Sequence, residues 1–122
     1  MPVRVVVVED NDVFREALEL MLGMREEVEV VAAVGDSRSA LTEVLEHRPD
    51  VVLIDYRMPG LDGVETTTQL LAELPDLAVV ALTASADAVQ EEELLAAGAV
   101  ACLGKDEELD EIVAAILRAA PT

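Results

Sequence analysis

Five residues of this sequence have side chains suited to phosphoryl chemistry, and each follows or closes a short apolar segment. Glu9 and Asp10 follow the first such segment, Asp55 the third and Lys105 the fifth, while Thr83 closes the fourth. Clustered carboxylates suit Mg²⁺, which takes one or two of them and keeps several waters. Phosphoryl transfer requires a divalent ion and donors around the reacting group, because its transition state spreads negative charge over the phosphoryl oxygens. A carboxylate can itself be the nucleophile and form an aspartyl-phosphate.

Two kinds of segment alternate along the chain and predict the elements that position these residues. Short segments rich in β-branched residues, typical of strands buried on both faces, lie at 3–8, 28–34, 51–54, 77–83 and 99–103. Segments with helical periodicity follow them, at 13–23, 37–47, 63–74, 87–98 and 106–119. Each strand–helix unit takes about 24 residues, which fits right-handed crossovers between parallel strands. The pattern therefore predicts an α/β fold, a five-stranded parallel sheet with helices on both faces.

Single residues indicate where several of these helices begin and end. Asp36 can cap the second helix and Asp62 the third, because a carboxylate accepts hydrogen bonds from the first free backbone N–H groups. The second helix is expected to end at Arg48, since the residue before a proline avoids helical angles. Gly35 fits a turn between strand and helix, and Gly98 fits a helix C-cap.

Composition limits the classes of protein to be considered. The 122 residues suffice for one domain, 1–122, and 52% of them are hydrophobic, which excludes intrinsic disorder. No apolar stretch approaches the roughly 18 residues of a membrane span, so we expect no membrane contact. A net charge of −18 predicts that this domain does not bind nucleic acid directly. The single cysteine, Cys102, excludes an internal disulfide and suits the reducing cytoplasm, where we expect the protein.

The predicted sheet offers one place where the five polar residues can meet. In an open α/β sheet, ligands bind outside the carboxyl ends of the strands, where the strand order reverses. If the order is 2-1-3-4-5, Glu9, Asp10 and Asp55 crowd together there. Three carboxylates in a half-buried cleft repel and raise one another's pKa unless a cation joins them. Lys105, the only lysine of the sequence, would approach from the other side, and Thr83 would offer a hydroxyl.

Four motifs, taken together, resemble the receiver domain of bacterial two-component response regulators. They are the acidic pair of VVEDND, LIDYRMPGLDG around Asp55, the Thr-Ala of LTAS and the lysine of CLGKD. The resemblance covers essentially the whole chain with the motifs in order. Lys105-Asp106 is similar to the NarL/FixJ-type subgroup, whose members carry a C-terminal DNA-binding helix-turn-helix. We expect no such DNA-binding domain within residues 1–122.

The resemblance implies a flavodoxin-like (βα)5 fold with strand order 2-1-3-4-5 and a magnesium site. Asp10 and Asp55 would bind Mg²⁺ directly, Glu9 through a water molecule, and the backbone carbonyl of Arg57 would complete the protein ligands. From the residues alone, Asp10 could instead cap the first helix, although Asn11 or Asp12 could do so equally well.

The resemblance also implies a function in two-component signal transduction. Asp55 would accept a phosphoryl group from the phosphohistidine of a sensor histidine kinase. The domain would catalyse its own phosphorylation in this way, and it would not be an enzyme that turns over a separate substrate. Lys105 would pair with the phosphoryl oxygens, and Thr83 would bind them and relay their presence. A change of conformation would then regulate an output domain or partner, with transcription as the expected output and a homodimer as a possible form.

Two alternatives remain open at this point. Receivers usually place Tyr or Phe three residues before the lysine, and this sequence has Cys102 there, which favours a receiver-like docking module regulated without phosphorylation. The complete set of site residues argues against that alternative. A phosphatase of the haloacid-dehalogenase type also uses an aspartyl-phosphate, but it carries the nucleophile after the first strand and a second Asp two residues later. Here the candidate follows the third strand, and Arg57 occupies that later position.

Overall fold

The computed structural model describes residues 1–57, 62–84 and 88–121. Within these ranges strands and helices alternate regularly along the chain. The strands are β1 Val3–Val8, β2 Val28–Val34, β3 Val51–Asp55, β4 Ala78–Thr83 and β5 Ala101–Gly104. The helices are α1 Asp12–Gly23, α2 Ser37–His47, α3 Gly63–Glu73, α4 Ala88–Ala96 and α5 Leu109–Ala119.

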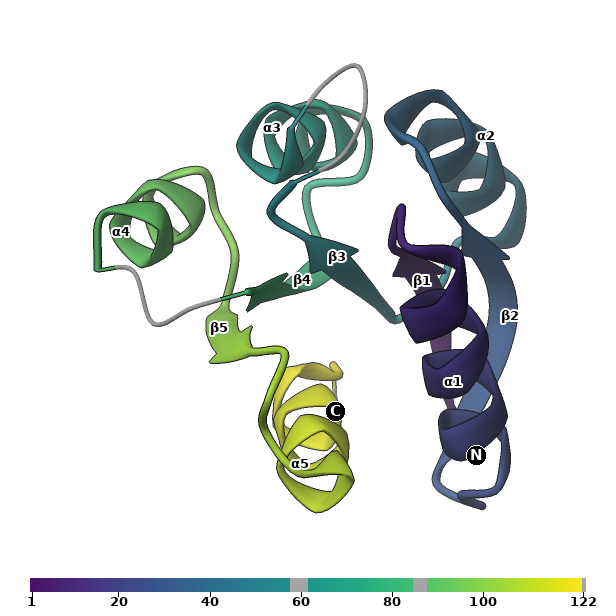
Figure 1. Cartoon of the computed structure of the whole chain (residues 1–122). Helices are drawn as coiled ribbons and strands as arrows, with labels where there is room; N and C mark the ends of the chain where they lie inside the picture. The colour runs from purple at the N-terminus through teal and green to yellow at the C-terminus, as the bar shows by residue number, and fades with distance from the viewer. Residues whose placement is uncertain (58–61, 85–87, 122) are drawn as a thin grey trace.

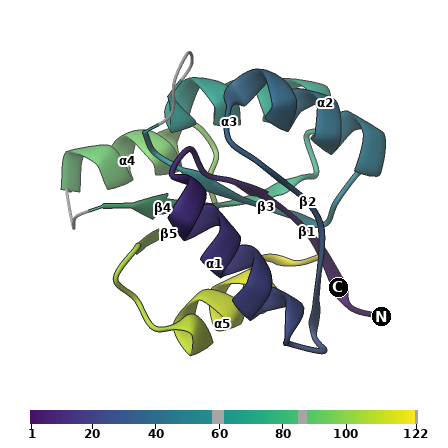
Figure 2. The ribbon, with the colours of Figure 1, turned by 45° about the vertical axis from the view of Figure 1, so that its right-hand side comes forward.

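The strands form one parallel sheet in the order β2-β1-β3-β4-β5. Helices α1 and α5 cover one face of this sheet, and α2, α3 and α4 cover the other, as both views show (Figures 1 and 2). The order reverses between β1 and β3, which are direct neighbours. This is the predicted doubly wound, flavodoxin-like arrangement, and the fold prediction is confirmed.

Each face of the sheet has its own apolar core, because successive side chains of a strand point to opposite faces. On the face of α1 and α5, Val7 and Leu53 pack with Leu18 and Ile116. A separate cluster on the other face joins Ile54 to side chains of α2, α3 and α4. All five residues of β3 are buried, which explains why its first four residues are an unbroken apolar run in the sequence.

The helix caps follow the sequence closely. Asp36 and Asp62 cap α2 and α3 as predicted, each accepting a hydrogen bond from a backbone N–H of the first turn. Asn11 caps α1, so Asp10 is not needed for that purpose. Gly98 has a φ of +115° just beyond α4, a conformation that favours glycine. Arg48 ends α2 in the left-handed region.

Several boundaries differ from those expected by one to three residues. Strand β3 includes Asp55, and α5 begins at Leu109 instead of residue 106. The later start has a local cause, because the N–H of Glu107 donates to the carbonyl of Gly104 and closes a turn before the helix. None of the helices in the described part of the chain is both long and apolar enough to cross a membrane.

Candidate active site at the carboxyl edge of the sheet

Strand alternation brings three of the five predicted residues to the same face. Leu53 of β3 and Leu103 of β5 point toward α1 and α5. Two residues after these leucines come Asp55, the last residue of β3, and Lys105, the first residue beyond β5, and both lie on that same side of the sheet. Glu9 stands in the same relation to Val7 of β1. The sheet thus collects two acids and the lysine from three separate strands.

The Lys105 ammonium group holds these two acids together. Its Nζ lies 2.7 Å from Oε1 of Glu9 and 3.2 Å from Oδ2 of Asp55. The same Nζ lies 5.0 Å from the ring centroid of Phe14, a cation–π distance. Glu9 and Asp55 are buried, with 1% and 3% of their surface exposed. Because unpaired buried carboxylates would be costly, Lys105 is the group that makes their burial tolerable.

The electrostatics differ sharply among the acids of the site. Burial raises the pKa of Asp55 to about 7, and the negative charge of Glu9 contributes to the rise. Burial acts in the same direction on Asp10, but hydrogen bonds to Asp55 and Glu9 and the charge of Lys105 hold the pKa of Asp10 below its usual range. Burial alone would lower the pKa of Lys105, yet the two carboxylates raise it. Lys105 therefore stays charged.

Glu9, Asp10 and Asp55 form a candidate site for a divalent cation. One carboxylate oxygen from each lies within 4.8 Å of the others. Glu9 has both oxygens engaged, Oε1 with Lys105 and Oε2 with the backbone N–H of Asn11 at 3.0 Å. Asp10 is exposed to solvent, so its carboxylate can reach an incoming ion. These residues fit a hard cation that takes few protein ligands and keeps its waters, as Mg²⁺ does.

Thr83 and Arg57 lie beside this group. Thr83 is the last residue of β4 and has 4% of its surface exposed, and its carbonyl accepts a hydrogen bond of 2.8 Å from the N–H of Lys105. By alternation the Thr83 side chain belongs to the face of α3 and α4, because Val79 and Ala81 point there. Arg57 lines a cavity of about 280 Å³ together with Asp10, Asn11, Asp55, Tyr56, Ala84, Gln90 and Lys105. Asp10, Asp55 and Lys105 therefore line the same cavity.

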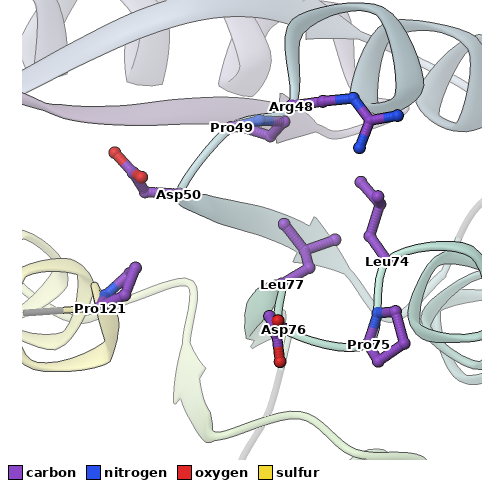
Figure 3. A pocket seen from close by; sticks show the side chains of 8 residues that line it. All are labelled: Arg48, Pro49, Asp50, Leu74, Pro75, Asp76, Leu77 and Pro121. Atoms are coloured by element: carbon purple, nitrogen blue, oxygen red, sulfur yellow. The ribbon is translucent and has the colours of Figure 1, made fainter.

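A cavity of similar volume, about 290 Å³, lies at the opposite end of the strands, where β3 and β4 begin (Figure 3). Its walls come from the α2–β3 connection, the α3–β4 connection and Pro121, two residues after α5, and they are rich in proline and leucine. Asp50 is one of the two acids that line this cavity, and its carboxylate already accepts a hydrogen bond of 2.9 Å from the backbone N–H of Arg4. Nothing there resembles the convergent acids and lysine of the carboxyl edge.

Sequence reasoning missed two contributors to the site. Phe14, the only phenylalanine of the chain, lies near Lys105, and Asn11 binds Glu9 through its backbone. Helical periodicity places Phe14 on the same face of α1 as Leu18 and Leu22, so its burial could have been expected. Its contact with Lys105 could not, because that contact depends on how α1 and the β5–α5 turn meet in space.

Comparison with known proteins agrees with this geometry. A sequence model of the response regulator receiver domain matches residues 5–117. The chain belongs to this family. Receiver domains of response regulators work with sensor histidine kinases in two-component systems and generally bind Mg²⁺ at an acidic pocket. The family assignment agrees with the interpretation of the four sequence motifs.

Individual relatives share about a third or more of the sequence. The transcriptional regulatory protein LnrK of Bacillus subtilis is 36% identical over 94% of this chain and 52% of its own length. The response regulator GacA of Pseudomonas viridiflava is 39% identical over 93% of this chain and 53% of its own. This receiver therefore spans about half the length of these relatives. A structure described as the signal receiver domain of NarL from Mycobacterium tuberculosis superposes with a TM-score of 0.91 at 36% identity, covering 96% of this chain and 94% of that one.

Proposed function

We propose that this receiver domain accepts a phosphoryl group on Asp55 from the phosphohistidine of a sensor histidine kinase in the cytoplasm. The observation that carries the proposal is the position of Asp55. A strand buried along its whole length ends on this carboxylate, which has an ammonium group at 3.2 Å and two further acids beside it. A rigid nucleophile with an ammonium group beside it and a cluster of acids that could hold a divalent ion suits in-line phosphoryl transfer.

Each neighbour of Asp55 has a role in this proposal. Asp10 and Asp55 would hold Mg²⁺ directly, the backbone carbonyl of Arg57 would complete the protein ligands, and Glu9 would contribute through a water molecule. The engagement of both Glu9 oxygens by Lys105 and Asn11 supports that indirect role. The bound ion would supply positive charge, so that Asp55 could react in its ionised form despite the high pKa that burial gives it. Lys105 moves from Asp55 to the incoming phosphoryl oxygens while it keeps its contact with Glu9.

The output of the domain is a shift between two conformations. Thr83 lies at the carboxyl end of β4. Its side chain belongs to the face of the sheet that α3 and α4 cover. A hydrogen bond from its hydroxyl to a phosphoryl group on Asp55 would bias the packing on that face, which is how a local charge change becomes a population shift. In a full-length regulator of the kind that the relatives represent, this shift would control transcription through a DNA-binding region. Formation of a homodimer is one way in which the shift could reach that region.

Intact-mass spectrometry after incubation with acetyl phosphate and Mg²⁺ tests the proposal. We expect one phosphoryl group per chain, lost in Asp55→Asn and in the presence of EDTA. Asp76→Asn is the matched control, because Asp76 is an exposed acid at the opposite edge of the sheet. A folded wild-type protein that binds Mg²⁺ but gains no mass contradicts the proposal and favours a docking module that works without phosphorylation.

A further inference from the structure

Arg15 of α1 is folded back against the backbone of the acidic pair and takes no part in the proposed chemistry. Its Nη1 donates to the carbonyl oxygen of Glu9 at 2.7 Å. Its Nη2 lies 2.6 Å from Oδ1 of Asp12, which holds the guanidinium from the solvent side. Only 20% of the Arg15 side chain is exposed. A planar guanidinium with two anchored nitrogens has a defined orientation, unlike a single flexible ammonium group.

The Glu9 carbonyl is a group that needs such a donor. The N–H of Glu9 still continues the sheet, donating to the carbonyl of Val34 at 2.9 Å. The register of β1 with β2 ends one residue earlier, at the pair Val8 and Val34, so the Glu9 carbonyl lies beyond the ladder. Glu9 is 1% exposed, and a buried carbonyl without a donor is costly. Arg15 supplies the donor that the end of the strand does not.

Gly35, at the end of β2, makes room for this guanidinium. A Cβ atom at position 35 would lie 2.7 Å from Nη1 of Arg15 and 3.6 Å from the Glu9 carbonyl oxygen. The backbone at Gly35 does not have a positive φ, so its conformation is open to other residues. Gly35 lies in the turn between β2 and α2, as the sequence predicts. The structure adds a second reason for a glycine there, which is space for the Arg15 side chain.

We propose that Arg15 is a positioning residue for the magnesium site and that Gly35 is the space it requires. The Glu9 carbonyl and the Asp10 nitrogen belong to one planar peptide group. Fixing the carbonyl therefore fixes the direction in which the chain enters Asp10, whose carboxylate must meet those of Glu9 and Asp55. The role toward the metal rests on the magnesium site of the proposed function, whereas the hold on the Glu9–Asp10 peptide does not.

Two variants disturb this contact in different ways. Arg15→Met removes the donor and one positive charge, and Gly35→Ala displaces the guanidinium without changing any charge. Arg118→Met is the control for charge, since Arg118 is exposed near the far end of α5. Gly23→Ala is the control for an added methyl group, because a Cβ at Gly23 meets nothing within 4 Å.

Two readouts separate positioning from a general loss of stability. Mg²⁺ affinity is measured by the fluorescence of Tyr56, the only tyrosine in a chain without tryptophan, which lies beside Asp55. We expect Arg15→Met and Gly35→Ala to weaken Mg²⁺ binding about tenfold, as outer partners of metal ligands typically do. Loss of a positive charge near a cation site would by itself strengthen binding, so weaker binding in Arg15→Met cannot be a charge effect. Both controls should stay within about twofold of the wild type.

The second readout needs no metal. Amide hydrogen exchange of Glu9 and Asn11, followed by NMR in EDTA, should accelerate about tenfold in both variants and in neither control. Wild-type exchange rates in Arg15→Met overturn the proposed hold on the peptide. Faster exchange with unchanged Mg²⁺ affinity overturns the positioning role. If the wild-type protein bound no Mg²⁺, the magnesium site and the positioning role would both fail. The exchange rates of the Glu9 and Asn11 amides would still test whether Arg15 holds the Glu9–Asp10 peptide. Wild-type Mg²⁺ binding without phosphoryl uptake would leave the positioning role standing while the proposed function failed.

Discussion

Replacing Asp55 by asparagine should stabilise the metal-free protein, and the gain should depend on pH in a defined way. Burial raises the pKa of Asp55 from 3.8 to about 7 in the folded chain. Between these values the unfolded chain has lost the proton that the folded chain retains. The contribution of Asp55 to the free energy of unfolding therefore falls as pH rises through this window, by at most about 1.4 kcal/mol per pH unit. It becomes level above pH 7.

The size of the effect follows from the two pKa values. A difference of about three corresponds to about 4 kcal/mol at full strength, and relaxation of a site that Lys105 already neutralises in part lowers the expected gain to about 2–3 kcal/mol. Asparagine keeps the shape and carries no charge. Lys105 does not lose its only partner, because Glu9 remains at 2.7 Å. The gain is a large fraction of the roughly 5–15 kcal/mol that stabilises a typical domain.

Urea unfolding followed by circular dichroism measures this difference. Wild-type protein and Asp55→Asn should be compared in EDTA at intervals from pH 5 to pH 8.5, so that the titration of groups outside the site cancels. We expect the advantage of the variant to grow up to about pH 7 and then stay constant. Adding Mg²⁺ at pH 8 should stabilise the wild-type protein and leave the variant nearly unchanged. A constant difference across the pH range, or a less stable variant at pH 8, would refute the assignment of the charge cost to Asp55.

Three further predictions concern single contacts. Phe14→Leu should keep the apolar packing but remove the cation–π contact with Lys105. We expect phosphoryl uptake from acetyl phosphate to slow about two- to fivefold in initial-rate measurements. An unchanged rate would show that Phe14 only fills space. Asp62→Ala should cost about 1 kcal/mol in urea unfolding, because Asp62 caps α3 through a 2.9 Å hydrogen bond from the N–H of Glu65. Leu53→Ala, in a strand residue 1% exposed, should cost about 2–5 kcal/mol by the same measurement, and a cost below 1 kcal/mol would mean that the core closes around the lost side chain.

Much of this molecule can be predicted from its sequence because the relevant signals are local. Alternation of β-branched and helix-period segments specifies a parallel α/β sheet, and residues such as Asp62 mark helix ends by short-range hydrogen bonding. Strand order is a different matter, since the same segments fit several orders. The order 2-1-3-4-5 was predicted only through the resemblance around Asp55 and Lys105.

The part of the site that was not predicted depends on contacts between elements far apart in the chain. Nothing near Arg15 in the sequence indicates that its guanidinium reaches the carbonyl of Glu9, or that Gly35 must be small for that reason. Helical periodicity predicts a helix from residue 106, three residues before the start of α5 at Leu109. In the structure a turn that begins at Gly104 takes up those residues instead.

The two separate cores have a consequence for how such a domain can diversify. Glu9, Asp55 and Lys105 project on the face of α1 and α5, whereas Thr83 and Cys102 belong to the face of α3 and α4. A substitution in the second core can alter the packing around Thr83 while leaving the groups that we propose to accept the phosphoryl group in place. In the proposed function, the sheet therefore separates the reacting groups from the side chains whose packing would change in response. These two sets meet at the carboxyl edge, where Thr83 and Asp55 end neighbouring strands.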